Sequence, residues 1–400
     1  MEWKEVTLGE LGTIVGGATP STKNPSFYDG NIPWLTPKDL SVNSNMYILR
    51  GERNITEAGF KSCSCKMLPK GSVLFSSRAP IGYVAIAAND MCTNQGFKSV
   101  IPNEETDSEF LYYLLKYNKD YIASQGSGTT FAEVSGKTMK DIEVVVPKEK
   151  EDQHRIASIL SSLDRKIELN NKINADLEEM AQAIFKNWFV DFEPFKDGKF
   201  VDSELGMIPE GWKVGRLTEI ASYMNGLAMQ KFPPENDEDS LPVLKIKELG
   251  QGFCGPDSDR CSCNIKDECK VHNGDVIFSW SGTLLVDVWC GGDCGLNQHL
   301  FKVTSKEYPK WFYYYWTKHH LQEFIHIAKD KAVTMGHIKR GHLEEAMVAI
   351  PDNDSMEKAH ELFEPILSKM ISLRLENSRL SLLRDTLLPR LMSGELEVPE

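Results

Sequence analysis

The stretch WKEVTLGEL at residues 3–11 returns as WKVGRLTEI at residues 212–220, and this repetition decides the fold. Further along, IPWLTPKDL at residues 32–40 returns as LPVLKIKEL at residues 241–249. Other landmarks keep the same order: GSVLFS at 71–76 and GDVIFS at 274–279, Gly17 and Gly226, Asn94-Gln95 and Asn297-Gln298, and the strand-like runs that end at Pro147 and Pro351. Because ordered self-similarity marks an internal repeat, the chain is two copies of a unit of about 200 residues.

The first part of each copy, residues 1–150 and 205–351, is predicted to form an α/β domain. Short apolar runs bounded by Gly, Pro and Ser, such as Val73–Ser76, Tyr83–Ile86 and Ile142–Pro147, are typical of strands. We expect helices over residues 107–124 and 310–329. The aromatic run Trp311–Trp316 lies in the second of these helices, and we interpret it as helix core rather than as a base-stacking platform.

The second part of each copy, residues 151–204 and 352–400, is predicted to be a long helix. In the first copy the seam positions step by four and three: Ile156, Leu160, Leu163, Ile167, Asn170, Asn174, Leu177, Ala181, Ile184 and Trp188. The second copy gives Ala359, Phe363, Ile366, Met370, Leu373, Asn377, Leu380, Arg384, Leu387 and Leu391. This period indicates a coiled coil. Asn174 and Asn377 occupy equivalent seam positions, where a buried Asn pair could fix the register.

The expected fold class is therefore α+β, with two tandem α/β domains joined by two long helices that form an antiparallel coiled coil with pseudo-two-fold symmetry. The alternative is that each helix packs as an ordinary amphipathic helix on its own domain. A helix over residues 151–188 would be about 55 Å long. Since one turn of B-DNA is about 34 Å, two such domains could touch one duplex one or two turns apart.

The net charge of −13 argues mildly against a nucleic-acid binder. The acidic excess lies largely in the two helical segments, and the two larger regions are nearly balanced. A local basic face therefore stays possible on either α/β domain. The chain has no apolar run long enough to span a membrane, and its charged N-terminus lacks a signal sequence, so we expect a cytoplasmic protein.

The motifs that suggest catalysis are weak. Gly136-Lys137-Thr138 resembles the end of a P-loop, but position 131 is Phe131 and a strand pattern follows, which argues against ATP binding. Asp257, Glu268 and Lys270 match a loose Mg²⁺ nuclease pattern with no equivalent in the first copy. The histidines of the second copy lack the H-E-x-x-H spacing: His319, His320, His326, His337 and His342. We therefore predict no catalytic residue.

The nine cysteines also favour no metal site. Their odd number in a long chain makes a disulfide framework unexpected. Cys254, Cys261, Cys263 and Cys269 could hold zinc, but their spacing is not the paired C-x-x-C of structural zinc sites. Free reduced thiols are the better interpretation.

Several segments together resemble one family. These are Gly16–Ser21, Asn31–Leu40, Leu74–Gly82, Thr93–Gly96, Ser279–Thr283 and Leu296–Val303. They are similar to the target recognition domains of type I restriction-modification specificity subunits, the HsdS family. The segment Glu151–Leu160 is similar to the entry into the central conserved helix of that family. The order of domain, helix, domain, helix covers nearly the whole chain.

The resemblance implies a specificity subunit with two target recognition domains, at 1–150 and 205–351, each reading one half of a bipartite, asymmetric double-stranded DNA target. The conserved helices at 151–204 and 352–400 would set the unread gap. Two modification subunits would dock on this scaffold and carry S-adenosylmethionine and the adenine methyltransferase chemistry. Restriction subunits would add ATP-driven translocation and Mg²⁺-dependent cleavage. The chain itself would be non-catalytic, would bind no cofactor and would serve bacterial defence.

Candidate DNA contacts are donors and acceptors on exposed loops. In the first domain they are Ser21, Thr22, Lys23, Ser77, Arg78, Ser127, Thr129 and Thr130; in the second they are Lys231, Lys245, Trp280, Ser281, His299, Lys331 and Thr334. The main alternative is a repeat scaffold that binds only proteins, and another is the nuclease above. Against the scaffold, equivalent loops differ, with Ser77-Arg78 in one copy and Trp280-Ser281 in the other, as two different half-sites would require.

Overall fold

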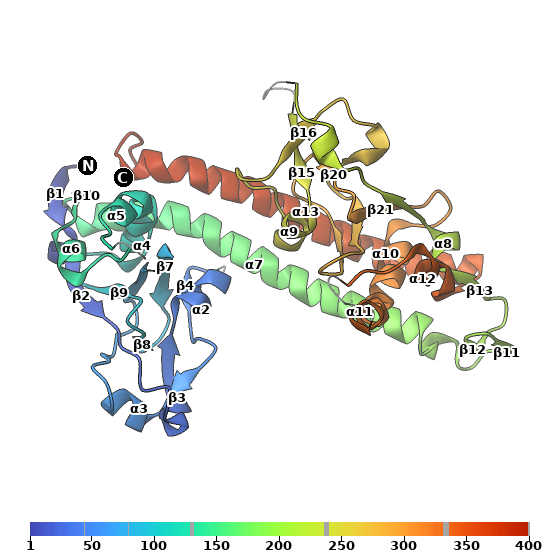
Figure 1. Ribbon diagram of the computed structural model, residues 1–400, viewed down its shortest axis with the longest axis horizontal. Helices are drawn as coiled ribbons and strands as arrows, with labels where there is room; N and C mark the ends of the chain where they lie inside the picture. The colour runs from blue at the N-terminus through green and yellow to red at the C-terminus, as the bar shows by residue number, and fades with distance from the viewer. Residues whose placement is uncertain (44, 79, 129–131, 236–239, 331–335, 399–400) are drawn as a thin grey trace. The chain divides into compact units, whose positions relative to one another are not determined.

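The computed structural model describes residues 1–43, 45–78, 80–128, 132–235, 240–330 and 336–398 (Figure 1). The chain divides into two compact units. Unit 1 holds residues 1–169 and 379–400, and unit 2 holds residues 170–378. We call residues 1–149 head 1 and residues 210–352 head 2. Within the described ranges, no helix is long and apolar enough to cross a membrane.

Head 1 is built on antiparallel pairing of its first and last strands, β1 (Trp3–Thr7) and β10 (Glu143–Pro147). A five-stranded sheet has the order β2 (Gly12–Gly16), β9 (Lys98–Pro102), β6 (Val73–Ser77), β7 (Ile81–Ala87), β4 (Tyr47–Ile48). A smaller sheet has the order β5 (Asn54–Ile55), β3 (Tyr28–Leu35), β8 (Cys92–Thr93). The helices are α1 (Leu8–Leu11), α2 (Pro37–Val42), α3 (Glu57–Lys61), α4 (Ser108–Tyr117), α5 (Lys119–Ser124) and α6 (Gly136–Asp141).

Head 2 repeats this plan. Its first and last strands, β13 (Lys213–Arg216) and β22 (Met347–Ile350), pair antiparallel. One sheet has the order β14 (Ser222–Asn225), β21 (Leu300–Thr304), β18 (Val276–Ser279), β19 (Leu285–Val288); the other is β16 (Arg260–Ser262), β15 (Ser240–Leu244), β20 (Cys294–Leu296), β17 (Lys270–Val271). Its helices are α8 (Leu217–Ile220), α9 (Ile246–Gln251), α10 (Lys310–His319), α11 (Leu321–Asp330) and α12 (Arg340–Glu345). A separate hairpin, β11 (Phe200–Ser203) and β12 (Gly206–Pro209), precedes it.

The strand registers fix which residues of the two heads correspond. In head 1, β3 and β8 pair in parallel, with Leu35 opposite Thr93. In head 2, β15 and β20 pair in parallel, with Leu244 opposite Leu296. The residues that follow these pairs therefore match one for one, as the sequence repeat predicts. The repeat and the α+β fold class are confirmed at the level of strand pairing.

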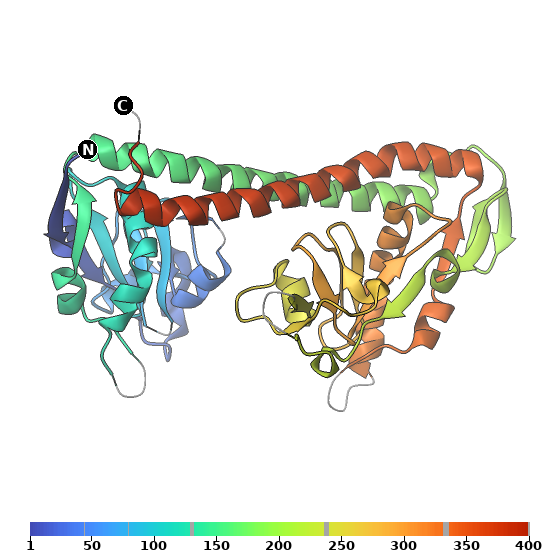
Figure 2. The same ribbon diagram turned by 90° about the horizontal axis from the view of Figure 1, so that it is seen from above.

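Two helices of 40 residues follow the heads, α7 (Lys150–Phe189) and α13 (Asn353–Met392). In each unit a part of α7 and a part of α13 lie side by side and run antiparallel (Figures 1 and 2). In unit 1, Arg384 contacts Asp164 while Leu391 packs in one cluster with Ile156. In unit 2, Asn377 contacts Asn170. Every predicted seam position is buried or half-buried.

The same helix segments also complete the cores of the heads. The main core of unit 1 includes Ile156 and Leu160 from the start of α7, and Leu391 and Met392 from the end of α13. The main core of unit 2 includes Phe363 and Met370 of α13 with Ala181, Phe185 and Phe189 of α7. The helices therefore pair with each other and pack on a head, so both interpretations of their apolar stripe hold together.

The Asn contacts of the helix pair differ from the simplest expectation. The Asn377 side-chain carbonyl accepts a hydrogen bond from Asn170 Nδ2 at 2.9 Å, and Asn377 Nδ2 donates to Asn171 Oδ1 at 2.7 Å. Asn174 takes no part in these bonds and lies one turn further along α7. A buried amide does mark the seam, but the antiparallel register gives Asn377 a different partner.

Three local predictions can be compared with the structure. The aromatic run Trp311–Trp316 is buried in the core of unit 2, which confirms the core interpretation. The helices expected over 107–124 and 310–329 are each divided in two, at Asn118 and at His320. Gly136-Lys137-Thr138 begins a short helix, α6, that Ser135 caps and that the sequence did not predict. The next element along the chain is the expected strand, β10.

A buried polar contact fastens the end of α13 to unit 1. Asp164 of α7 accepts hydrogen bonds from Arg384 Nη1 and from the Tyr113 hydroxyl of α4, both at 2.6 Å. The side chains of Asp164 and Arg384 are 9% and 19% exposed. Burial raises the pKa of Tyr113, so the phenol stays a donor at neutral pH. Removing one partner of such a buried pair leaves the other charge without compensation.

We predict that Arg384→Ala lowers the free energy of unfolding of unit 1 by about 3–5 kcal/mol, because the Asp164 carboxylate stays buried without its cation. Denaturant titration, with amide hydrogen exchange in α4 and at the start of α7 as the readout for unit 1, measures this change. The control Arg379→Ala removes an exposed arginine from the same helix and should change stability by about 0.5 kcal/mol or less. Equal, small effects of both substitutions would show that the contact does not hold the unit together.

Candidate nucleic-acid interface

Each head brings a loop rich in small residues against an Asn-Gln turn. Ala18 N donates to Thr93 O at 3.0 Å in head 1, and Leu227 N donates to Leu296 O at 2.9 Å in head 2. A Cβ on Gly17 would lie 2.1 Å from Asn94 O, and a Cβ on Gly226 would lie 2.2 Å from Leu296 O. Only glycine fits this approach, which explains why the repeat keeps it.

A buried acid organises the next loop in both heads. Asp39 Oδ2 accepts from Thr36 N at 2.7 Å, and Glu248 Oε2 accepts from Lys245 N at 3.3 Å. The second oxygen holds a neighbouring segment, since Asp39 Oδ1 accepts from Glu52 N and Glu248 Oε1 accepts from the Ser258 hydroxyl. These acids fix the backbone at equivalent positions. The side chains there differ: the Thr36 hydroxyl also donates to Asp39 at 2.7 Å, whereas the Lys245 side chain pairs with Asp259.

In head 2 the frame encloses a groove of about 660 Å³. Its polar lining is Gln230, Lys245, Lys247, Asp259, Arg260, Asn297, Gln298 and His299, and its apolar lining is Met229, Val243 and Ile246. Lys245 forms an ion pair with Asp259. Gln298 Nε2 lies 3.3 Å from His299 Nε2. The groove thus combines several hydrogen-bond donors with one carboxylate, a mixture suited to reading polar edges.

Head 1 carries different side chains on the same frame. By the strand registers, Thr36 stands where head 2 has Lys245, and Gly96 stands where it has His299. Asn54 faces Pro33 as Arg260 faces Pro242. Lys245 and Arg260 of head 2 therefore stand where head 1 has the neutral side chains of Thr36 and Asn54.

A second cluster in head 1 surrounds Glu133. The Glu133 carboxylate lies 3.1 Å from Lys98 Nζ and 3.5 Å from Arg78 Nη1. The backbone groups of Ser127 and Glu133 bond reciprocally at 3.1 and 3.0 Å, and Glu133 also forms a β-bridge with Arg78. Two of the sequence candidates, Arg78 and Ser127, are thereby brought together.

The corresponding part of head 2 is aromatic. The ring centroids of Trp280 and His299 lie 5.9 Å apart, and Trp280 meets His337 edge-on at 6.4 Å. Ile338 N donates to Trp280 O at 3.1 Å, as Val134 N donates to Ser77 O at 3.0 Å in head 1. The two heads therefore share this backbone contact and differ in its side chains.

The other sequence candidates fall into three groups. Exposed loop residues are Ser21, Thr22 and Lys23, and Lys231 is exposed at the end of a 3-10 helix, Met229–Lys231. Ser77 and Ser281 are only 0% and 5% exposed, so neither reaches the surface, and the Ser77 hydroxyl donates to Gly96 O at 3.2 Å. Thr129, Thr130, Lys331 and Thr334 lie outside the described residues. Lys247 and Arg260 line the groove but were not among the candidates from the sequence. The match of Lys247 with Lys38 in the repeat could have pointed to Lys247.

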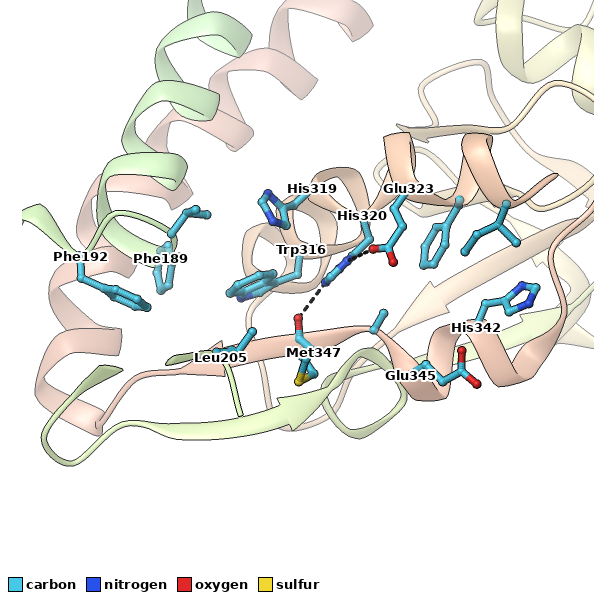
Figure 3. Close-up of a pocket in the computed structure, with 14 residues that line it drawn as sticks. Phe189, Phe192, Leu205, Trp316, His319, His320, Glu323, His342, Glu345 and Met347 are labelled. Carbon is cyan, nitrogen blue, oxygen red and sulfur yellow. Dashed lines mark hydrogen bonds and ion pairs between the residues drawn. The ribbon is translucent and has the colours of Figure 1, made fainter. Parts of the chain in front are cut away.

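Three of the histidines of head 2 surround one small pocket. His319, His320 and His342 line a pocket of about 250 Å³ with Phe189 and Trp316 (Figure 3). His320 Nε2 contacts Met347 O at 2.8 Å, and its Nδ1 lies 3.4 Å from Glu323. Burial lowers the pKa of His319. Nowhere in the described ranges do three or more His, Cys, Asp or Glu side chains form a group that could hold a metal ion.

The two alternative metal sites are not assembled. Lys270 pairs with Asp267 at 2.7 Å, and Asp257 and Glu268 are exposed. Cys261 and Cys269 pack in one apolar cluster, whereas Cys254 packs in another. The pKa of Cys254 is lowered mainly because the Cys294 thiol bonds to it. All nine cysteines are free.

Comparison with known proteins identifies a family to which this chain is similar. The model of the type I restriction modification DNA specificity domain matches residues 1–179 and 209–377. The chain is 38% identical to the type I restriction enzyme MjaIX specificity subunit of Methanocaldococcus jannaschii, over 100% of this chain and 94% of that one. It is 23% identical to the HindI specificity subunit of Haemophilus influenzae, over 99% and 100% of the two chains.

One solved structure supports the fold. The S subunit of a type I restriction-modification system from M. genitalium aligns with a TM-score of 0.56 at 17% identity, covering 100% of this chain and 97% of that chain. At this identity the likeness concerns the fold alone. The family match is separate from it and covers both heads and the larger part of each long helix.

Proposed function

The chain belongs to the family of type I restriction-modification DNA specificity domains, and we propose that its two heads each read one half of a split, asymmetric DNA target. The observation that carries this proposal is the contrast between the heads. Both keep the glycine loop, the buried acid and the Asn-Gln turn, while the outward side chains at equivalent positions differ in charge. A frame that is kept while its surface chemistry changes is what two different half-sites require.

The contacts divide by chemistry. The exposed cations Lys23 and Lys231 are proposed to contact phosphates, which position a protein on DNA without reading its sequence. Arg78, Ser127, Lys245, Trp280 and His299 are proposed to face base edges. Ser21 and Thr22, and also Thr129, Thr130, Lys331 and Thr334 outside the described ranges, complete the proposed surface. Ser77 and Ser281 are buried, so we propose that they support the DNA-binding surface without contacting DNA.

The chain's role in the complex is proposed to be specificity and scaffolding without catalysis. Residues 1–150 and 205–351 would act as target recognition domains, and residues 151–204 and 352–400 would act as spacer and docking helices. Modification subunits would bind S-adenosylmethionine and methylate adenine, and restriction subunits would use ATP and Mg²⁺. A scaffold that binds only proteins is the alternative, and it gives no reason for the charge contrast between the heads.

The helices offer a surface for the modification subunit. Leu382 and Leu383 of α13 are 71% and 47% exposed, and Leu169 of α7 in the same unit is 52% exposed. Leu382 and Leu383 are adjacent in the sequence, and exposed apolar patches mark interaction sites. We propose that these leucines are covered by a modification subunit.

We predict that exchanging residues 1–150 for the matching head of the M. jannaschii relative changes one half of the recognition sequence only. The reason is that each frame holds its own set of reading side chains. Sequencing of methylated adenines in cells that express the chimaera with its modification subunit reads out the target. The reciprocal exchange of residues 205–351 is the matched control and should change the other half.

A change in both halves after either single exchange would contradict independent reading by the heads. Wild-type cells in which no methylated motif depends on this chain would contradict the proposed function as a whole.

We also predict that Leu382→Asp with Leu383→Asp weakens binding of the modification subunit at least tenfold. Each leucine loses about 1.5–3 kcal/mol of burial at the interface, and 1.4 kcal/mol is a factor of ten. Co-purification and titration by calorimetry measure this. Leu49→Asp, at a leucine of head 1 that is 67% exposed, is the control and should leave binding unchanged. Equal affinity of all variants would place the docking surface elsewhere.

A further inference from the structure

We propose that the groove of head 2 reads a guanine, with the Arg260 guanidinium donating to the O6 and N7 acceptors of the base. This inference rests on the proposed function and names the chemistry of one half-site. Arginine bonded through two N–H groups to guanine is the commonest specific contact in the major groove. The groove holds Arg260 beside Lys245, Lys247, Gln298 and His299, so its floor and walls are rich in donors.

The contacts of Arg260 prepare it for such a bond. Its Nε donates to the Ser240 hydroxyl at 2.6 Å, and its Nη2 donates to Ser240 O at 2.7 Å. These bonds occupy one edge of the planar guanidinium, which has five N–H donors. Among the described residues, no hydrogen bond is formed by the end edge, with one N–H on each of Nη1 and Nη2, so this edge can donate to a second pair of acceptors. Because Ser240 already orders the plane, less side-chain entropy is lost when a base binds.

The carboxylate of Asp259 argues for a base rather than a phosphate. Asp259 lines the same groove next to Arg260 and pairs with Lys245. A carboxylate at this position offsets part of the attraction that Lys245, Lys247 and Arg260 exert on a phosphate group. It can instead accept a hydrogen bond from the amino group of cytosine, the partner of guanine in the duplex. A groove with paired donors and one acceptor therefore matches a G·C edge.

Head 1 lacks the same set. The residues that match Lys245, Arg260 and His299 are Thr36, Asn54 and Gly96. Lys38, which matches Lys247, is engaged by Glu52 at 2.7 Å, and the Thr19 hydroxyl donates to the Gln95 side chain. The guanine read through this groove position should thus occur only in the half-site of head 2.

The test measures base preference and salt dependence separately. Wild type, Arg260→Ala and Arg260→Lys are purified as complexes with the modification subunit and bound to duplexes in which each position of the target is varied. Lys306→Ala, an exposed cation that does not line the groove, is the charge-matched control. For both Arg260 variants we expect roughly ten- to hundredfold less discrimination for guanine at one position of the head 2 half, with the other half unchanged.

Each outcome decides the inference. Loss of preference at one guanine in both variants supports it, because Arg260→Lys keeps the charge and loses the paired donors. Uniform weakening on all sequences, with a salt slope smaller by about one, would identify a phosphate contact and overturn guanine reading while the proposed function stands. No change relative to Lys306→Ala, or a head 2 half without guanine, would also overturn it. A wild-type complex without any sequence preference would refute the proposed function itself.

Discussion

Each main core is completed by residues from the end of a long helix that belongs to the other copy of the repeat. The rest of the structure depends on this constraint. In unit 1, Leu391 and Met392 of α13 pack with Ile156 and Leu160 of α7. In unit 2, Phe185 and Phe189 of α7 pack with Phe363 of α13. Burial of apolar surface is the largest favourable term in folding, so neither head reaches its full core without residues from a distant part of the chain. Each copy of the repeat therefore needs residues of the other copy to complete its main core.

Polar contacts then make that arrangement specific. Asp164 joins Arg384 and Tyr113 in unit 1, whereas Lys318 of α10 joins Glu178 of α7 at 2.6 Å in unit 2. The two units therefore use different ion pairs to fasten a long helix to a head. Between the helices, Asn377 bonds to Asn170 and Asn171. Since cores and buried acids hold the frame, the outward loops can vary in chemistry without loss of the fold. That separation lets one scaffold present two unlike surfaces.

Much of this architecture could be predicted from the sequence because its signals are periodic. The heptads located α7 and α13, and the repeat located the paired strands of both heads. The breaks at Asn118 and His320 were missed because they depend on local bonds, such as Asn118 Nδ2 to Leu114 O at 2.9 Å. The partners of Asn377 depend on an antiparallel register that no local pattern reveals. The groove was found only in part: Lys245 and His299 were expected, but Arg260 required the pairing of β15 with β16.

Selection from a random duplex library shows whether this one chain reads a split DNA target. The chain is purified with its co-expressed modification subunit, bound to the library at physiological salt, and the retained duplexes are sequenced. If each head reads one half-site, one motif is enriched, made of two unlike halves separated by an unread gap of fixed length. Tight assembly of the two proteins with no motif above the nonspecific background would show that the heads do not read DNA and favour a scaffold that binds only proteins.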